Sequence, residues 1–202
     1  MAEKRLVVFA DYACPFCYLA EVGAVRLREA GLEVRGAAFE LRPPGTPLPD
    51  ARAPWMAQAW EQSVEPLAAE AGVSMAQPAL MTRTRKAHEA AAYARSQGMY
   101  DRMHAALYAA YWQDGRDIGR IDVLVDIARA AGLDPSGLRV ALDIDQCTAR
   151  VEQDEAWAAR LGLAGVPAYV LTDDADGTGT AADTRIGLQR YDELRAWMGF
   201  EK

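Results

Sequence analysis

Sequence typical of β-strands occurs at the two ends of this chain, and sequence typical of helices fills the part between them. Short segments rich in apolar or alternating residues predict strands at 6–10, 33–39, 168–171 and 184–187. Neither end carries enough strands for a stable sheet of its own. We therefore expect the two ends to pair into one sheet, which gives an α/β fold with a helical block inserted between its halves.

A proline-rich stretch, 42–49, marks the beginning of the helical block, because four prolines in eight residues interrupt any regular structure. Apolar residues at helical spacing then continue until the second pair of strands. These boundaries predict a discontinuous domain of residues 1–45 and 164–202 and an inserted, all-helical subdomain of residues 46–163.

Helix signals within the block predict where some of its helices begin and end. Pro66 is expected to kink or split a helix at 55–71. Asp134 followed by Pro135 is a start signal, because an acidic side chain caps the first N–H groups and proline fits the first turn. The last helix of the block is expected at 145–161.

The composition limits the partners of the protein. Of its 202 residues, 51% are hydrophobic, which is enough to bury a sizeable core. The 22 Lys and Arg against 29 Asp and Glu give a net charge of −7, which argues against binding to nucleic acid. No apolar run approaches the ~18 residues of a membrane span or forms a signal-peptide core. We therefore expect a cytoplasmic protein with neither nucleic acid nor membrane as a partner.

The most informative motif is Cys14-Pro15-Phe16-Cys17, which follows the first strand and begins a predicted helix. In a reducing compartment such a pair indicates redox or metal chemistry rather than a structural disulfide. Backbone N–H groups and the helix dipole favour the thiolate form of Cys14, and thiolates attack disulfides. Cys17, one turn later, is expected to be more buried and less ionised, yet within bonding reach. Asp11 is expected to cap the turn ahead of the motif.

Other interpretations of the polar residues stay open. A zinc site would need two further ligands, and the candidates Cys147, His88 and His104 lack metal-ligand spacing, so we expect no bound metal. A purely structural role for the cysteine pair is a second alternative. We expect Cys147 to be a partly buried apolar residue on one helical face with Val151, and both histidines to be satisfied or solvent-facing. The acidic stretch 172–179 has part of the spacing of a calcium loop, but we interpret it as a hairpin.

Taken together, these features resemble a known family. A Cys-Pro-x-Cys motif after an N-terminal strand, a long helical insertion, and Gly165-Val166-Pro167 ahead of the third strand resemble thioredoxin-fold disulfide oxidoreductases of the DsbA type. The cytoplasmic FrnE-like branch is the more similar, through segments at 11–18, 39–43, 85–90 and 115–118. The resemblance covers nearly the whole chain and implies a thioredoxin-like fold that carries the helical subdomain as an insertion.

The same resemblance implies an enzyme, a dithiol-disulfide oxidoreductase that acts on protein or small-molecule disulfides. It makes Cys14 the nucleophile, Cys17 the resolving thiol, and Pro167 a cis proline that faces them. The backbone of Val166 is then expected to pair with an extended peptide, as an added strand does. The expected substrate contacts are Val166, Pro167, Pro15 and Phe16.

No separate cofactor is expected beyond the redox-active pair, although the resemblance allows glutathione as a reductant or substrate. The expected partners are disulfide- or thiol-containing proteins or peptides, and a homodimer is allowed. Two alternative functions stay open: a glutathione-dependent isomerase or transferase of the kappa or 2-hydroxychromene-2-carboxylate isomerase type, and a non-catalytic peptide-binding or chaperone module. The two cysteines favour the oxidoreductase, because those glutathione-dependent relatives commonly lack the pair.

Overall fold

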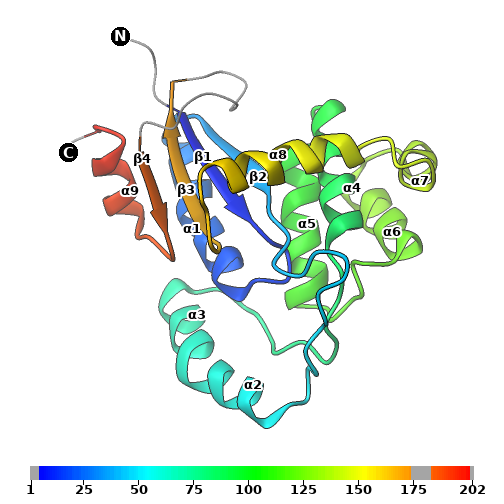
Figure 1. Ribbon diagram of the computed structural model, residues 1–202, viewed down its shortest axis with the longest axis horizontal. Helices are drawn as coiled ribbons and strands as arrows, with labels where there is room; N and C mark the ends of the chain where they lie inside the picture. Colours follow the sequence, from blue (N-terminus) through cyan, green and yellow to red (C-terminus); the bar gives the residue numbers. More distant parts are fainter. Residues whose placement is uncertain (1–4, 174–182, 201–202) are drawn as a thin grey trace. The chain divides into compact units, whose positions relative to one another are not determined.

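The computed structural model describes residues 5–173 and 183–200 (Figure 1). The chain divides into two compact units, one of Met1–Leu41 with Asp154–Lys202 and the other of Arg42–Gln153, here called the sheet unit and the helical unit. Most of the acidic stretch 172–179 lies outside the described residues. Among the described helices, none is long and apolar enough to cross a membrane.

The described part of the sheet unit contains a four-stranded sheet in the order β2-β1-β3-β4. Its strands are β1 (Arg5–Ala10), β2 (Val34–Ala38), β3 (Ala168–Thr172) and β4 (Asp183–Ile186). β1 runs parallel to β2 and antiparallel to β3, and β4 is antiparallel to β3. The two ends of the chain therefore pair into one sheet, and the predicted α/β arrangement is confirmed.

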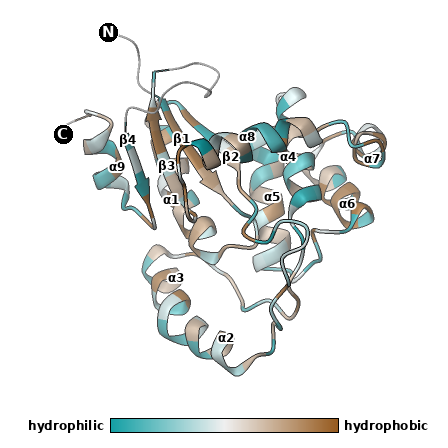
Figure 2. Cartoon of the chain, viewed as in Figure 1, coloured by the Kyte–Doolittle hydropathy of each residue, from teal (hydrophilic) through white to brown (hydrophobic). Residues whose placement is uncertain are grey.

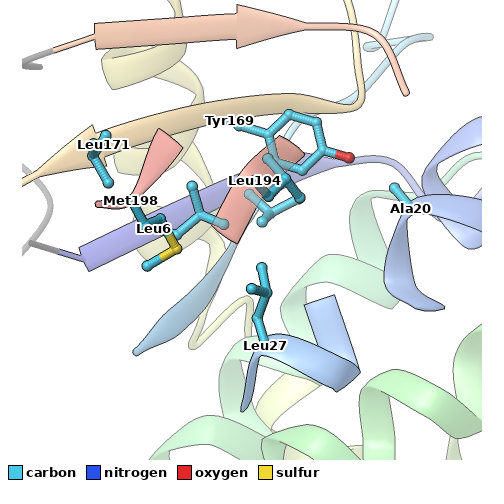
Figure 3. Close-up of a cluster of buried hydrophobic side chains, with 8 residues drawn as sticks. Leu6, Ala20, Leu27, Tyr169, Leu171, Leu194 and Met198 are labelled. Atoms are coloured by element: carbon cyan, nitrogen blue, oxygen red, sulfur yellow. The ribbon is translucent and has the colours of Figure 1, made fainter. Parts of the chain in front are cut away.

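Side chains on the two faces of the sheet form separate apolar clusters, because successive strand residues point to opposite faces. The central strands β1 and β3 are the most hydrophobic part of the sheet (Figure 2). One cluster packs the sheet against α1 (Pro15–Glu29) and α9 (Tyr191–Trp197) (Figure 3), and comprises Leu6, Val8, Ala20, Leu27, Tyr169, Leu171, Leu194 and Met198. The cluster on the opposite face comprises Val7, Phe9, Ala37, Trp157, Ala158, Leu163, Ala168 and Val170.

The helical unit consists of short helices joined by turns. In chain order they are α2 (Pro54–Ala59), the π-helix η1 (Trp60–Val64), α3 (Glu65–Ala71), α4 (Arg85–Ser96), α5 (Tyr100–Trp112), α6 (Ile121–Ala131), α7 (Pro135–Asp143) and the first residues of α8 (Thr148–Arg160).

Pro66 splits its helix, as the sequence predicts. Proline lacks an N–H group and its ring would clash with the carbonyl four residues earlier, so an α-helix cannot continue unchanged through this position. The chain widens into the π-helix instead, and the Glu65 N–H group bonds to the Trp60 carbonyl, five residues back.

Helix α8 begins at Thr148, so the predicted start at Asp145 is wrong. Asp145 has a φ of 56°, a left-handed conformation that a right-handed helix excludes. Its carboxylate accepts a hydrogen bond from the ammonium group of Lys86 in α4. Cys147 therefore precedes the helix, rather than sharing a helical face with Val151 as predicted.

Candidate active site

The Cys14–Cys17 motif begins helix α1, as the sequence predicts. Cys14 directly precedes the helix, with φ −97° and ψ 116°, and Pro15 is the first helical residue. The Cys14 carbonyl accepts hydrogen bonds from the N–H groups of Cys17 (3.1 Å) and Tyr18 (3.3 Å). Pro15 suits this place because the first N–H groups of a helix have no partner within it. The thiol of Cys14 therefore lies at the positive end of the helix dipole.

Asp11 fixes the turn between β1 and the motif. Its side chain is buried, with the residue 1% exposed. Oδ1 accepts the N–H group of Ala13 at 3.1 Å, and Oδ2 accepts that of Leu41 at 2.7 Å. The Asp11 carbonyl also accepts the N–H group of Cys14 at 3.1 Å. One residue thus shapes the turn ahead of the thiols and fastens it to the segment after β2, which confirms the predicted capping role.

Residues near the carboxyl end of the chain complete the surroundings of Cys14. The Cys14 thiol donates a hydrogen bond to the Val166 carbonyl, 152 positions away in the sequence, with 3.7 Å between sulfur and oxygen. The Val166–Pro167 peptide bond is cis, and the resemblance implies a cis bond at this position. The Pro167 carbonyl accepts the Gly187 N–H group at 2.8 Å, which joins this segment to the end of β4. Pairing of β1 with β3 brings the two segments together.

Both thiols of the motif are free and buried, Cys14 with 3% and Cys17 with 2% of the residue exposed. The expected difference in burial is therefore not found. Burial raises the pKa of Cys17 well above its ordinary value, and the hydrogen bond with Cys14 and the negative charges of Cys14 and Asp11 add to the increase. A hydrogen bond with the Asp11 backbone opposes it in part. Cys17 is thus a protonated thiol at neutral pH, in agreement with its expected weak ionisation.

The four expected substrate contacts all lie in the sheet unit. Pro15 and Phe16 are half-buried at the start of α1, and Val166 is half-buried beside the Cys14 thiol. Pro167 is buried. The structure therefore brings Val166 to Cys14 from the far end of the chain, while the role of these four residues in substrate binding stays a prediction.

The candidate metal ligands Cys147, His88 and His104 belong to the helical unit. In the part of the chain that the structure describes, no three His, Cys, Asp or Glu residues are grouped to hold a metal. The ring of His104 packs against Tyr100 and Tyr108, with centroids 4.9 Å and 5.0 Å away, and Nδ1 lies 3.2 Å from the Tyr100 hydroxyl. This is the satisfied histidine that we predicted. Cys147 is half-buried, and burial, with the charge of Glu89, raises its pKa.

Tyr169 of β3 belongs to this site, although its sequence pattern indicates only a strand. It is fully buried on the face of the sheet that packs against α1. Burial raises the pKa of its hydroxyl, and the nearby Cys17, Glu21 and Cys14 add to the increase. The sequence feature that indicates this role is the position of Tyr169, two residues after Pro167. Alternate residues of a strand share a face, so Tyr169 is expected on the same face of the sheet as Pro167.

Comparison with known proteins identifies the family to which the sequence is similar. The family described as DSBA-like thioredoxin domain matches residues 5–198. An uncharacterized protein of Bacillus subtilis, YwbO, is 28% identical over 182 residues, which cover 84% of this chain and 87% of that protein.

The solved structures that are similar over almost the whole chain include the following two. The crystal structure of a probable DsbA oxidoreductase from Streptomyces coelicolor has a TM-score of 0.80 and 25% identity, and covers 98% of this chain and 92% of its own. A 2-hydroxychromene-2-carboxylate isomerase has a TM-score of 0.77 and 20% identity, and covers 96% of this chain and 94% of its own. At that identity the second structure shows a shared fold alone.

The expected thioredoxin-like fold is therefore confirmed, whereas the assignment to the FrnE-like branch stays a prediction. Because the family match covers both strand-bearing ends and the helices between them, the chain belongs to the family of DSBA-like thioredoxin domains.

Proposed function

We propose that this protein is a dithiol-disulfide oxidoreductase that exchanges thiols and disulfides with proteins, peptides or small molecules through Cys14 and Cys17. The observation that carries the proposal is the placement of Cys14. It begins helix α1, its sulfur lies 3.7 Å from the Val166 carbonyl oxygen, and a protonated thiol follows one turn later. A helix N-terminus stabilises negative charge on sulfur, and a thiolate is the species that attacks a disulfide.

The exchange proceeds in two steps that balance in atoms and electrons. The Cys14 thiolate attacks one sulfur of the substrate disulfide, the substrate S–S bond breaks, and the other sulfur leaves as a thiolate that takes up a proton. Cys17 then loses its proton and attacks the Cys14 sulfur, which releases the second substrate thiolate. The substrate is reduced by two electrons and the cysteine pair is oxidised by two, and the reverse sequence oxidises a dithiol.

The Val166 carbonyl is the proposed contact for the substrate backbone. In the reduced protein it accepts a hydrogen bond from the Cys14 thiol. A thiolate has no proton to donate, so ionisation of Cys14 frees this carbonyl to accept an N–H group of an extended peptide. The half-buried Pro15 and Phe16 supply apolar contacts beside the same sulfur, and Pro167 brings no competing N–H group.

The two thiols supply all the chemistry that this exchange requires. Glutathione is a suitable reductant for returning the oxidised pair to its dithiol form, and a suitable substrate when it is held in a mixed disulfide. The proposed setting is the cytoplasm, and the proposed partners are proteins or peptides that carry disulfides or thiols.

The proposal is tested by following the reduction of insulin disulfides by dithiothreitol in the presence of the protein. The wild-type protein should accelerate the reaction. With the Cys14→Ser variant, the rate should equal the rate measured in the absence of protein. Cys17→Ser should stop at a mixed disulfide on Cys14, which mass spectrometry detects. Cys147→Ser, in the helical unit, is the matched control and should keep the full rate.

The alternatives give different outcomes in the same experiments. Full activity of Cys14→Ser would contradict the proposed function. Glutathione-dependent turnover that persists in Cys17→Ser would support the isomerase or transferase instead. Binding of peptides with no exchange by the natural sequence would support a non-catalytic module.

A further inference from the structure

The Tyr169 hydroxyl is buried against the helix turn that follows Cys17. Tyr169 is 0% exposed and belongs to the apolar cluster between the sheet, α1 and α9. Figure 3 shows its hydroxyl directed toward α1 at Ala20. Ala20 follows Cys17 by three residues, and residues three apart lie on the same side of a helix. The hydroxyl therefore faces the side of α1 that carries the buried thiol.

The hydrogen of this hydroxyl has no acceptor among the described residues. The backbone amide of Gln189 approaches the oxygen, but an N–H group only donates, so the phenolic hydrogen stays unused. Glu21 also acts on the hydroxyl, yet its carboxylate pairs with Arg28 at 2.5 Å. A buried donor without an acceptor is unfavourable, so it calls for an explanation.

Tyr169 remains protonated over the whole range in which thiols react. Burial raises the pKa of the hydroxyl well above its ordinary value, and the charges of Cys17, Glu21 and Cys14 raise it further, while the Gln189 amide offsets part of the increase. The hydroxyl is therefore a hydrogen-bond donor and not a base.

Cys17 needs such a donor in the second step of the exchange. Its thiol must lose a proton before it can attack Cys14, and burial opposes the negative charge that results. The side chains of Cys14 and Asp11 oppose this charge as well, and the hydrogen bond with the Asp11 backbone offsets these effects only in part. A donor that is already oriented stabilises charge in a buried site without any rearrangement of solvent.

We propose that Tyr169 is a positioning residue for the resolving thiol and that its hydroxyl donates a hydrogen bond to the Cys17 sulfur as negative charge develops there. The idea rests on the proposed dithiol exchange. Cys17 loses its proton and forms the bond to Cys14, the bond from Cys14 to the substrate sulfur breaks, and the departing thiolate takes up a proton. Tyr169 keeps its own proton throughout.

The test is a single-turnover reaction of the reduced protein with DTNB, an aromatic disulfide that releases a coloured thiolate. Attack by Cys14 releases the first thiolate and resolution by Cys17 releases the second, so the two steps appear as separate phases. All variants carry Cys147→Ser, which removes the third thiol. In Tyr169→Phe we expect an unchanged first phase and a second phase about tenfold slower, the effect of losing one hydrogen bond to a charged group.

Two control variants separate the hydroxyl from packing. Tyr191→Phe removes a hydroxyl from a residue packed against the same cluster, and Leu194→Ala removes buried apolar volume from that cluster. Neither should slow the second phase selectively. An unchanged second phase in Tyr169→Phe, equal slowing of both phases, or the same selective slowing in Leu194→Ala would overturn the role of Tyr169. Release of both thiolates at full rate by Cys14→Ser would overturn the proposed function itself.

Discussion

The Arg35 guanidinium and the Asp154 carboxylate form a 2.6 Å ion pair inside the sheet unit, with 18% and 10% of the two side chains exposed. The other oxygen of Asp154 accepts the N–H group of Ala38 at 3.1 Å. β2 is an outer strand of the sheet in the described part of the chain, so part of its backbone has no neighbouring strand there. One side chain of α8 therefore satisfies both a charge and a backbone donor of this strand.

We expect Asp154→Ala to lower the free energy of unfolding by about 2–4 kcal/mol, because it removes the carboxylate that pairs with the mostly buried Arg35 guanidinium and that accepts the Ala38 N–H group. Urea denaturation followed by circular dichroism measures the change. Glu152→Ala, at an exposed position of the same helix, is the matched control and should change stability by less than about 0.5 kcal/mol. A loss no larger than that of the control would contradict this role of Asp154.

The raised pKa of Cys17 predicts that the reduced protein loses stability in alkaline solution. In the unfolded chain this thiol ionises near its ordinary pKa of 9.0, whereas the folded protein retains the proton to higher pH. The stabilisation is fully present below the unfolded pKa and is lost as the pH rises through the folded one, because the unfolded state then binds fewer protons.

Guanidinium denaturation at a series of pH values checks this expectation. The unfolding free energy of the reduced natural sequence should fall above pH 9.0 more steeply than that of Cys17→Ala. The comparison isolates Cys17, since the buried Tyr169 is present in both proteins and titrates in the same direction. A difference between the two proteins that does not vary with pH would contradict the raised pKa.

Asp11→Asn removes a negative charge near Cys17 and keeps the size of the side chain. We expect the pKa of Cys17 to fall, because the Asp11 carboxylate raises it. Alkylation of Cys17 by iodoacetamide at a fixed pH should therefore be faster. The measurement uses proteins that also carry Cys14→Ser and Cys147→Ser, so that one of the three cysteines remains.

The Asp11 carboxylate accepts the N–H groups of Ala13 and Leu41. The Asn side chain can accept only one of them, and its NH2 group faces the other donor. The same variant should therefore lower the free energy of unfolding by about 1–2 kcal/mol. If Asp11→Asn left the alkylation rate of Cys17 unchanged and also left the free energy of unfolding unchanged, the Asp11 carboxylate would have no effect on Cys17.

In the helical unit, Gly119 occupies a position that no larger residue fits. A Cβ there would lie 2.6 Å from Thr82 Oγ1 and 3.0 Å from the Arg83 carbonyl oxygen. The Thr82 hydroxyl and the Gly119 N–H group both bond to the Asp117 carboxylate, so these neighbours cannot move without losing hydrogen bonds. We expect Gly119→Ala to reduce stability by about 1–3 kcal/mol, measured by thermal unfolding. Gly165→Ala, whose Cβ would meet nothing within 4 Å, should unfold as the natural sequence does.

Features that depend on neighbouring residues could be predicted from the sequence. The apolar runs of β1 and β3 identify strands, because both lie in the centre of the sheet. Asp134 caps α7 as expected, and its carboxylate accepts the N–H groups of Ser136 (3.0 Å) and Gly137 (3.1 Å). The motif lies at the start of α1 because Pro15 and the turn at Asp11 act over a few residues.

Features that depend on contacts between distant residues could not be predicted. α8 starts later than predicted, because Asp145 has a left-handed backbone conformation, and its side chain bonds Lys86, 59 positions earlier. Cys14 is as buried as Cys17, although its helix-terminal position suggests exposure. The hydroxyl of Tyr169 reaches α1 from a strand more than a hundred residues away in the sequence. The domain boundaries at 45/46 and 163/164, the cytoplasmic location and the homodimer stay predictions.

The separation of Cys14 from Val166 along the chain bears on how the protein is made. The ribosome adds the Val166 carbonyl, which borders the Cys14 sulfur, 152 residues after it adds Cys14. β3, the antiparallel neighbour of β1, is likewise synthesised long after β1. Contacts this distant in sequence form late and slowly. A nascent chain therefore carries both thiols well before the segment that borders the Cys14 sulfur in the folded protein has been made.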